Sequence, residues 1–168
     1  MSQIDFINAC KDGHRETVKL LLDLEGDRRI DVHARDEEAF IWACKNGHLE
    51  IVKLLLDLEG DRRIDVHARD EESFRAACNN GHLAVVKLLL DLEGDRRIDV
   101  HARDEQAFRW ACRNGHIEVI KLLLELEGNR RIDVHANNEY AFRAACLYNL
   151  EDVKLLLDLE GDRKIPKE

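Results

Sequence analysis

Cysteine and histidine, which bind metals and do nucleophilic chemistry, recur along the chain at a fixed separation. The pairs are Cys10 and His14, Cys44 and His48, Cys78 and His82, and Cys112 and His116. Thiolate and imidazole suit zinc, but a structural zinc site takes four ligands and each pair supplies two. Gly47 also interrupts any helix that would hold Cys44 and His48 together. We therefore expect no metal site, and we expect these histidines to hydrogen-bond neighbouring backbone.

The remaining polar residues form no catalytic constellation. No Ser–His–Asp set, Cys–His–Asn set or carboxylate pair stands out as unique, and the Cys–His pair is present in several copies. The glycines fall where helices are expected to end and form no phosphate-binding loop. The chain is therefore expected to be a non-enzyme with no catalytic residues and no cofactor.

These pairs belong to an internal repeat. The phrase LLLDLEGDRRIDVHARDE starts at Leu20, Leu54 and Leu88, always 34 residues apart. A period of this length is typical of a solenoid, in which one supersecondary unit is copied and neighbouring units cover each other. We expect a single domain spanning 1–168. Its units are an N-terminal capping unit at 1–30, internal repeats at 31–64, 65–98 and 99–132, and a C-terminal unit at 133–168.

The second unit shows the elements that each repeat must contain. Asp36 is a suitable N-cap, and Phe40, Ala43 and Cys44 share one face of the helix that follows. Gly47 is expected to end this helix in the left-handed conformation. A second, largely apolar helix is predicted over 49–58, stopped by Gly60 and followed by an extended, charged connector.

The five cysteines take one place in successive units, at Cys10, Cys44, Cys78, Cys112 and Cys146. Packed helices lie ~9–10 Å apart, whereas a disulfide requires Cα atoms within ~7 Å. All five are therefore predicted to be reduced, buried core residues.

The sequence from Ala43 to Leu56, ACKNGHLEIVKLLL, resembles the A-A-x-x-G-H-x-E-x-V-x-L-L-L run of the ankyrin repeat, and it recurs at 77–90 and 111–124. The resemblance implies an all-α solenoid of five 34-residue helix-turn-helix units with long connectors. It also implies a protein-interaction scaffold that binds on its concave side. The tetratricopeptide repeat has the same period, but its signature is absent. The usual T-P-L-H before the first helix is replaced by EAFI at 38–41.

The connector at 26–36 is copied without change at 60–70 and 94–104. This near-identity resembles designed, consensus ankyrin-repeat proteins, and a recently duplicated natural array is the alternative. Each connector carries one histidine before alanine, at His33, His67, His101 and His135. We interpret these four as a structural ladder between units, and the other interpretation is a set of pH-sensitive contacts.

Residues that break the repeat are the candidate interface. Tyr140, Leu147 and Tyr148 replace charged or amide residues of the other units, and with Ala144 they share one helix face. Ile41 and Trp42 are second contributors, because Ile41 replaces an arginine and Trp42 alternates with alanine between units. We expect this patch to hold a homo-oligomer, most readily a homodimer and next a cyclic tetramer. The alternative is a different protein partner on the concave face.

Charge and composition narrow the remaining classes. The net charge is −9, and the arginine pairs are flanked by carboxylates, so no nucleic-acid partner is expected. The sequence has no apolar run long enough to span a bilayer, which argues against a membrane partner. The first residues lack the basic start and apolar core of a signal peptide. The expected location is therefore cytoplasmic.

Overall fold

The computed structural model of the chain describes residues 2–148 and 150–159, and the side chains of these residues apart from 148 and 150–153. Within this part the chain forms five pairs of helices joined by short turns. The pairs are α1 (Gln3–Asp12) and α2 (Arg15–Leu22), α3 (Ala34–Lys45) and α4 (Leu49–Leu56), α5 (Ala68–Asn79) and α6 (Leu83–Leu90), α7 (Ala102–Asn114) and α8 (Ile117–Leu124), and α9 (Ala136–Tyr148) and α10 (Leu150–Leu157).

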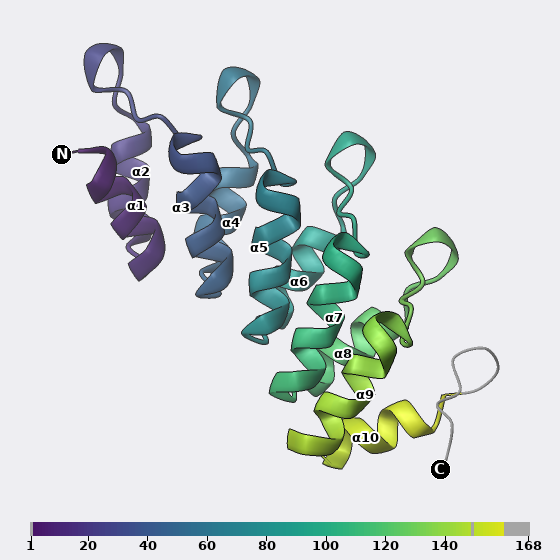
Figure 1. Cartoon of the computed structure of the whole chain (residues 1–168). Helices are drawn as coiled ribbons and strands as arrows, with labels where there is room; N and C mark the ends of the chain where they lie inside the picture. The colour runs from purple at the N-terminus through teal and green to yellow at the C-terminus, as the bar shows by residue number, and fades with distance from the viewer. Residues whose placement is uncertain (1, 149, 160–168) are drawn as a thin grey trace.

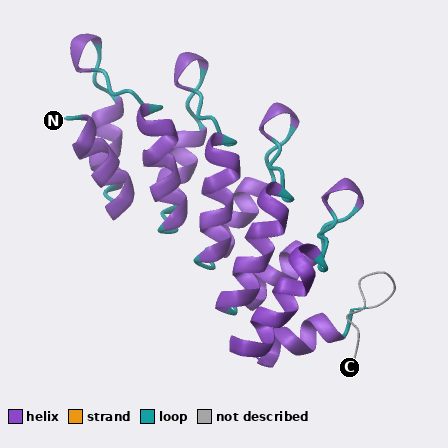
Figure 2. Ribbon diagram, in the orientation of Figure 1, coloured by secondary structure: helices purple, strands orange, loops and turns teal. Residues whose placement is uncertain are grey.

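The first helices of the pairs stand side by side in one row, here called the inner helices, and the second helices, the outer helices, lie behind them (Figure 1). Long loops after the outer helices project from one edge of the array as fingers. Each described fingertip is a single 3-10 turn, at η1 (Gly26–Arg28), η2 (Gly60–Arg62), η3 (Gly94–Arg96) and η4 (Gly128–Arg130). Figure 2 shows no strand in the described residues. The predicted all-α solenoid of stacked units is therefore confirmed.

The core is a continuous column of apolar side chains between the two rows. Each of the first four units contributes a fully buried phenylalanine, and burying such a side chain stabilises the fold by ~1.5–3 kcal/mol. These residues are Phe6, Phe40, Phe74 and Phe108. Branched residues of the outer helices, such as Val52 and Leu55, close the same layers. Because each layer is completed by its neighbours, the units form one cooperative array.

Four of the five cysteines lie in this core, as predicted. Cys10, Cys44, Cys78 and Cys112 are buried. Burial raises the pKa of the Cys10 thiol to about 12 and holds the pKa of Cys44 and Cys78 well above its usual range. These four side chains are therefore unreactive, apolar packing groups.

Cys146 is different, and its predicted burial was wrong. It is exposed, although it occupies the same repeat position as Cys112. The last unit is one residue shorter here, since Asn149-Leu150 stands where the other units have Gly-His followed by arginine, leucine or isoleucine. In Figure 1 helix α10 runs at a steep angle to the other outer helices. The last unit therefore does not reproduce the layer that covers the other cysteines.

The start of the inner helix α3 also differs from the prediction. Asp36 is not an N-cap, because Arg35, Asp36 and Glu37 all have left-handed backbone angles, with φ between 52° and 63°. The same three-residue left-handed turn recurs in α5, α7 and α9. Non-glycine residues adopt this conformation only when surrounding contacts hold them there. The right-handed helix begins after the turn.

The helix ends agree more closely with the sequence. Gly47 has φ +75° and ends the turn between α3 and α4 in the predicted left-handed conformation. Helix α4 ends at Leu56, two residues before the predicted end, because the chain leaves the helix at Asp57 to form the finger. Gly60, which was expected to stop the helix, instead begins the 3-10 turn of the fingertip.

Candidate functional site

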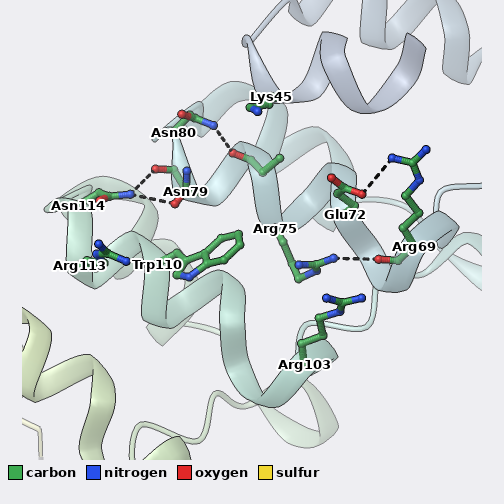
Figure 3. Close-up of a pocket in the computed structure, with 11 residues that line it drawn as sticks. Lys45, Arg69, Glu72, Arg75, Asn79, Asn80, Arg103, Trp110, Arg113 and Asn114 are labelled. Atoms are coloured by element: carbon green, nitrogen blue, oxygen red, sulfur yellow. Dashed lines mark hydrogen bonds and ion pairs between the residues drawn. The ribbon is translucent and has the colours of Figure 1, made fainter. Parts of the chain in front are cut away.

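A groove crosses the inner helices at the centre of the array, over α5 and α7. We call it the inner-face groove, and it has a volume of about 890 Å³. Figure 3 shows side chains from α3, α5 and α7 converging on it. Its lining residues are Lys45, Arg69, Glu72, Arg75, Ala76, Asn79, Asn80, Arg103, Trp110, Arg113 and Asn114.

The hollow exists because one repeat position alternates in size. This position is tryptophan in α3 and α7 (Trp42 and Trp110) but alanine in α5 (Ala76). Trp110 and Ala76 both line the groove, and the indole of Trp110 faces the space above the α5 backbone (Figure 3). The missing side-chain volume at Ala76 therefore leaves an apolar hollow beside an aromatic ring.

The groove is cationic although the whole chain is acidic. Its lining contains Lys45, Arg69, Arg75, Arg103 and Arg113, against a single carboxylate, Glu72. The net charge of the chain is −9. The excess carboxylates therefore lie outside the lining of the groove, and the local charge of the groove is positive.

Arg75 is the structural member of this set. It is 4 % exposed. Its Nε donates to the carbonyl of Asp70 (2.7 Å) and its Nη2 to the carbonyl of Arg69 (2.8 Å), while Nη1 contacts the side chain of Gln106. Burial lowers its pKa, although the guanidinium remains charged at any ordinary pH. Arg75 thus holds the left-handed turn that begins α5.

The same position explains one break in the repeat. Arg109 repeats the contacts of Arg75, donating to the carbonyls of Asp104 (2.7 Å) and Arg103 (3.0 Å). Ile41 cannot donate, and in its unit the carbonyl of Arg35 accepts from Arg69 of the next unit instead. Ile41 itself is 5 % exposed. The replacement is therefore compensated within the chain and offers almost no surface to a partner.

The other cations of the groove are more available. Arg103 pairs with Asp70 (Nη2 to Oδ2, 2.9 Å), and Arg69 lies 3.5 Å from Glu72. The ammonium of Lys45 lies 4.4 Å from the centre of the Trp42 ring. Arg113 is exposed and forms no ion pair with any residue in the described part of the chain. Its guanidinium can therefore take an external anion without losing an internal one.

The connector histidines form a ladder between successive fingers. His67 Nδ1 lies 2.6 Å from Glu71 Oε1, and His67 Nε2 donates to the carbonyl of Asp95 in the next finger (2.8 Å). The same carboxylate oxygen accepts the backbone N–H of Asp99 (3.3 Å). His33 with Glu37 and His101 with Glu105 repeat the pattern. The predicted ladder is thus present, and it joins each unit to the following one.

Both ring nitrogens of a ladder histidine face acceptors. Nε2–H is used by the carbonyl, so Nδ1 and the carboxylate must share a further proton. Desolvation by itself would lower the pKa of His67, but the bonds to Glu71 and Asp95 outweigh it and raise the pKa. Burial raises the pKa of Glu71, which is 4 % exposed. Each rung of the ladder therefore holds its proton more tightly than free histidine or glutamate would.

The histidines of the turns between helices are also structural. His48 Nε2 donates to the carbonyl of Lys11 (2.8 Å), and His82 to that of Lys45 (2.9 Å). The expected backbone bonds are therefore present and occupy the ring nitrogens that a metal would need. No group of three or more potential ligands is placed to hold a metal ion in the part of the chain that the structure describes.

The residues predicted to form an interface do not gather on one patch. Trp42, on α3, is half-buried between Lys11 and Lys45. Tyr140, Ala144 and Leu147 lie on α9, and the inner helices α5 and α7 stand between α3 and α9 (Figure 1). Ala144 is 5 % exposed and Leu147 is 76 % exposed. Tyr140 is half-buried, with the Arg109 guanidinium 5.2 Å from its ring centre. The side chain of Tyr148 lies outside the described residues. Among the predicted residues whose side chains are described, Leu147 is thus the most exposed.

Comparison with sequence models of protein families gives a match to ankyrin repeats (three copies) over residues 6–70 and 74–166. The chain belongs to the ankyrin-repeat family. The match removes the tetratricopeptide alternative, and it makes this ankyrin-repeat protein a protein-interaction module of a typically non-enzymatic family. A search of curated proteins finds no match. No helix in the described residues is long and apolar enough to cross a membrane.

The groove of this ankyrin-repeat protein was not identified from the sequence. The sequence-based judgement of charge concerned the arginine pairs of the connectors, such as Arg62-Arg63, and these pairs do not line the groove. The signal lay in columns 34 residues apart, since Lys45, Asn79 and Arg113 stack in successive units, as do Arg69 and Arg103. None of these columns contains a carboxylate.

Proposed function

We propose that the chain is a non-enzymatic scaffold that binds a different protein on its inner helices, through the inner-face groove. The observation that supports this most directly is the apolar hollow between Ala76 and Trp110, surrounded by arginine side chains. Tryptophan and arginine are the residue types that dominate binding energy in protein interfaces, especially when they surround a pocket. The ankyrin-repeat family assignment supports the same use.

Selection from an unbiased displayed peptide library tests this proposal. The Ala76→Trp variant fills the hollow and should lose the ligands that the natural chain selects. Ala84→Trp adds the same ring to an exposed position on the outer helix α6 of the same unit and should retain them. Circular dichroism of both variants checks that the fold is intact. Ligands that bind Ala76→Trp as well as they bind Ala84→Trp would refute the groove as the binding site.

Self-association is a second candidate, supported by the exposure of one large apolar side chain. Leu147 is 76 % exposed on α9, where other units have lysine, asparagine or arginine. Covering such a side chain in a dimer contributes ~1.5–3 kcal/mol, and two-fold symmetry would use it twice. Tyr140 is a weaker contributor, because Arg109 already covers part of its ring.

Size-exclusion chromatography with light scattering separates the two candidates. A defined dimer or tetramer at micromolar concentration supports self-association, and a monomer supports a foreign partner alone. Replacing Tyr140, Leu147 and Tyr148 with glutamate, lysine and asparagine should then give a folded monomer. An assembly that survives this triple replacement would exclude the α9 surface as the contact.

A further inference from the structure

The inner-face groove has a chemistry that specifies its partner more narrowly. We propose that it recognises an acidic, extended segment of a partner protein, in which two carboxylates flank one apolar side chain. This inference rests on the proposed function, and it adds the chemical class of the ligand.

The first step is the distribution of charge along the groove. Lys45 and Arg113 come from the ends of α3 and α7 that lie nearest the turns to the outer helices. Arg69 and Arg103 come from the opposite ends of α5 and α7, nearest the fingers (Figure 3). Arg75 lies in the middle of α5, and its guanidinium reaches back to the finger end of the helix. Glu72 is the single carboxylate of the lining. Cations therefore stand at both ends of the groove. At the finger end Arg69 and Arg103 are paired with Glu72 and Asp70, but a guanidinium has five N–H donors, so each end can hold one carboxylate of a ligand.

The second step is the apolar middle. Ala76 and Trp110 lie between the two cationic ends, and the alanine leaves room for a side chain beside the indole ring. An apolar or aromatic side chain that fills this hollow would be removed from water, which favours binding. The groove therefore predicts an apolar residue between the two carboxylates.

The third step is the spacing. The right-handed part of α7 spans ~11 Å from Gln106 to Arg113 at ~1.5 Å per residue, and Arg103 lies beyond Gln106, at the start of the left-handed turn (Figure 3). An extended peptide covers the distance from Arg103 to Arg113 in about four to five residues at ~3.3 Å each. The long arginine side chains adjust the separation by a few ångströms. A segment with acidic residues about four positions apart, and an apolar residue midway, matches the groove.

A protein segment fits the rest of the surface better than a nucleic acid does. Asparagine side chains, which both donate and accept hydrogen bonds as a peptide backbone requires, line the groove at Asn79, Asn80 and Asn114. A nucleic acid extends well beyond a groove of about 890 Å³, and its remaining phosphates would meet a chain of net charge −9. The cationic field is local, which suits a short acidic stretch.

Fluorescence anisotropy with labelled peptides tests the inference. The probes share a core of glutamate, alanine, a variable apolar residue, alanine and glutamate, and matched probes carry glutamine in place of both glutamates. The unsubstituted chain should bind the best acidic probe at least about tenfold more tightly than its glutamine counterpart, and this difference in affinity should shrink as the salt concentration rises. Equal binding of the acidic and glutamine probes would overturn the inference.

Two charge variants locate the site. Arg113→Gln should weaken the acidic probe about three- to tenfold, because it removes an exposed cation without breaking an ion pair within the described chain. Lys87→Gln, which removes an exposed cation from outer helix α6, should leave binding unchanged. Equal effects of the two variants would overturn the assignment. A single-stranded DNA 12-mer that displaces the acidic probe at equal concentration would also overturn it, in favour of a nucleic-acid site.

The unbiased selection separates this inference from the function on which it depends. Ligands that are lost on Ala76→Trp and are rich in acidic residues support both. Ligands that are lost on Ala76→Trp but carry no acidic preference overturn the acidic-segment inference and leave the interaction function intact. Ligands that are unaffected by Ala76→Trp overturn both.

Discussion

Removing one carboxylate from the histidine ladder should uncouple two neighbouring units. Glu71 is the choice, because its Oε1 accepts from His67 Nδ1 (2.6 Å) within its own unit and from the Asp99 N–H (3.3 Å) in the next. Glu71→Ala removes both contacts at once. The stability of a repeat array is the sum of the stability of each unit and of the contacts between neighbouring units. Losing the bond to Asp99 weakens a contact between neighbours.

The magnitude follows from these contacts. A hydrogen bond to a charged group contributes ~1.5–3 kcal/mol, and the lower value applies because His67 and Asp99 reach water once the carboxylate is gone. Two such bonds give ~3 kcal/mol. Glu71 Oε2 is buried without a partner, so alanine also relieves ~1 kcal/mol of desolvation. Glu71→Ala should therefore lower the free energy of unfolding by ~2 kcal/mol.

Urea unfolding at pH 6, followed by circular dichroism at 222 nm, measures this loss. Glu93→Ala is the matched control, because Glu93 is an exposed glutamate on the following finger, and a change there should stay within ~0.5 kcal/mol. Hydrogen exchange at the Asp99 amide should accelerate in Glu71→Ala alone. Equal stability of the two variants, or unchanged protection at Asp99, would refute the ladder as a coupling element.

Three further predictions follow from the same contacts. The pKa of each ladder histidine is raised in the folded state. Their contribution to stability is therefore complete below pH ~6.5, the pKa of an unfolded histidine, and is lost as the pH rises through the folded pKa. The free energy of unfolding should fall from pH 6 to pH 8, and His67→Asn should reduce that fall. No pH dependence in this window would contradict the shared proton. Gly47→Ala should lower the free energy of unfolding by ~2 kcal/mol or more, because it strains a residue at φ +75° and drives a methyl group into the His82 ring. Gly60→Ala, at φ +62° with no atom nearby, should lower it by ~1 kcal/mol. Denaturant unfolding compares the two variants, and equal losses would show that the ring contact is unimportant. A thiol reagent without denaturant should label Cys146 quickly and the other cysteines slowly; mass spectrometry of the labelled protein would contradict the packing if a second thiol reacted as fast.

The sequence predicted those features that depend on residues close together in the chain. The spacing of Phe40, Ala43 and Cys44 defined a buried helix face, and Gly47 marked the left-handed turn. The start of the inner helix was misjudged because Asp36 and the glutamates after it have the composition of a helix N-terminus. Contacts from the ladder and from Arg69 of the next unit instead hold these residues in a left-handed turn. Those contacts join residues of different elements or units, which a single repeat does not reveal.

The candidate site was predictable only in part for the same reason. The candidate interface residues on α3 and α9 were chosen where the units differ, yet Ile41 and Ala144 proved to be buried. The groove is built from residues of three successive units, and it becomes visible only when positions 34 residues apart are stacked. The alternation of Trp110 with Ala76 was noted in the sequence, but its consequence, a hollow, required the stacked structure.

The central claim is that this ankyrin-repeat protein binds partners in the inner-face groove. The most direct measurement is a titration of the isotopically labelled chain with the tightest ligand of the unbiased selection, followed by nuclear magnetic resonance. The Trp110 indole N–H signal and the backbone amide signals of α5 and α7 should shift together and saturate at one ligand per chain. Shifts confined to the fingers or to α9, with the Trp110 signal unmoved, would contradict the central claim.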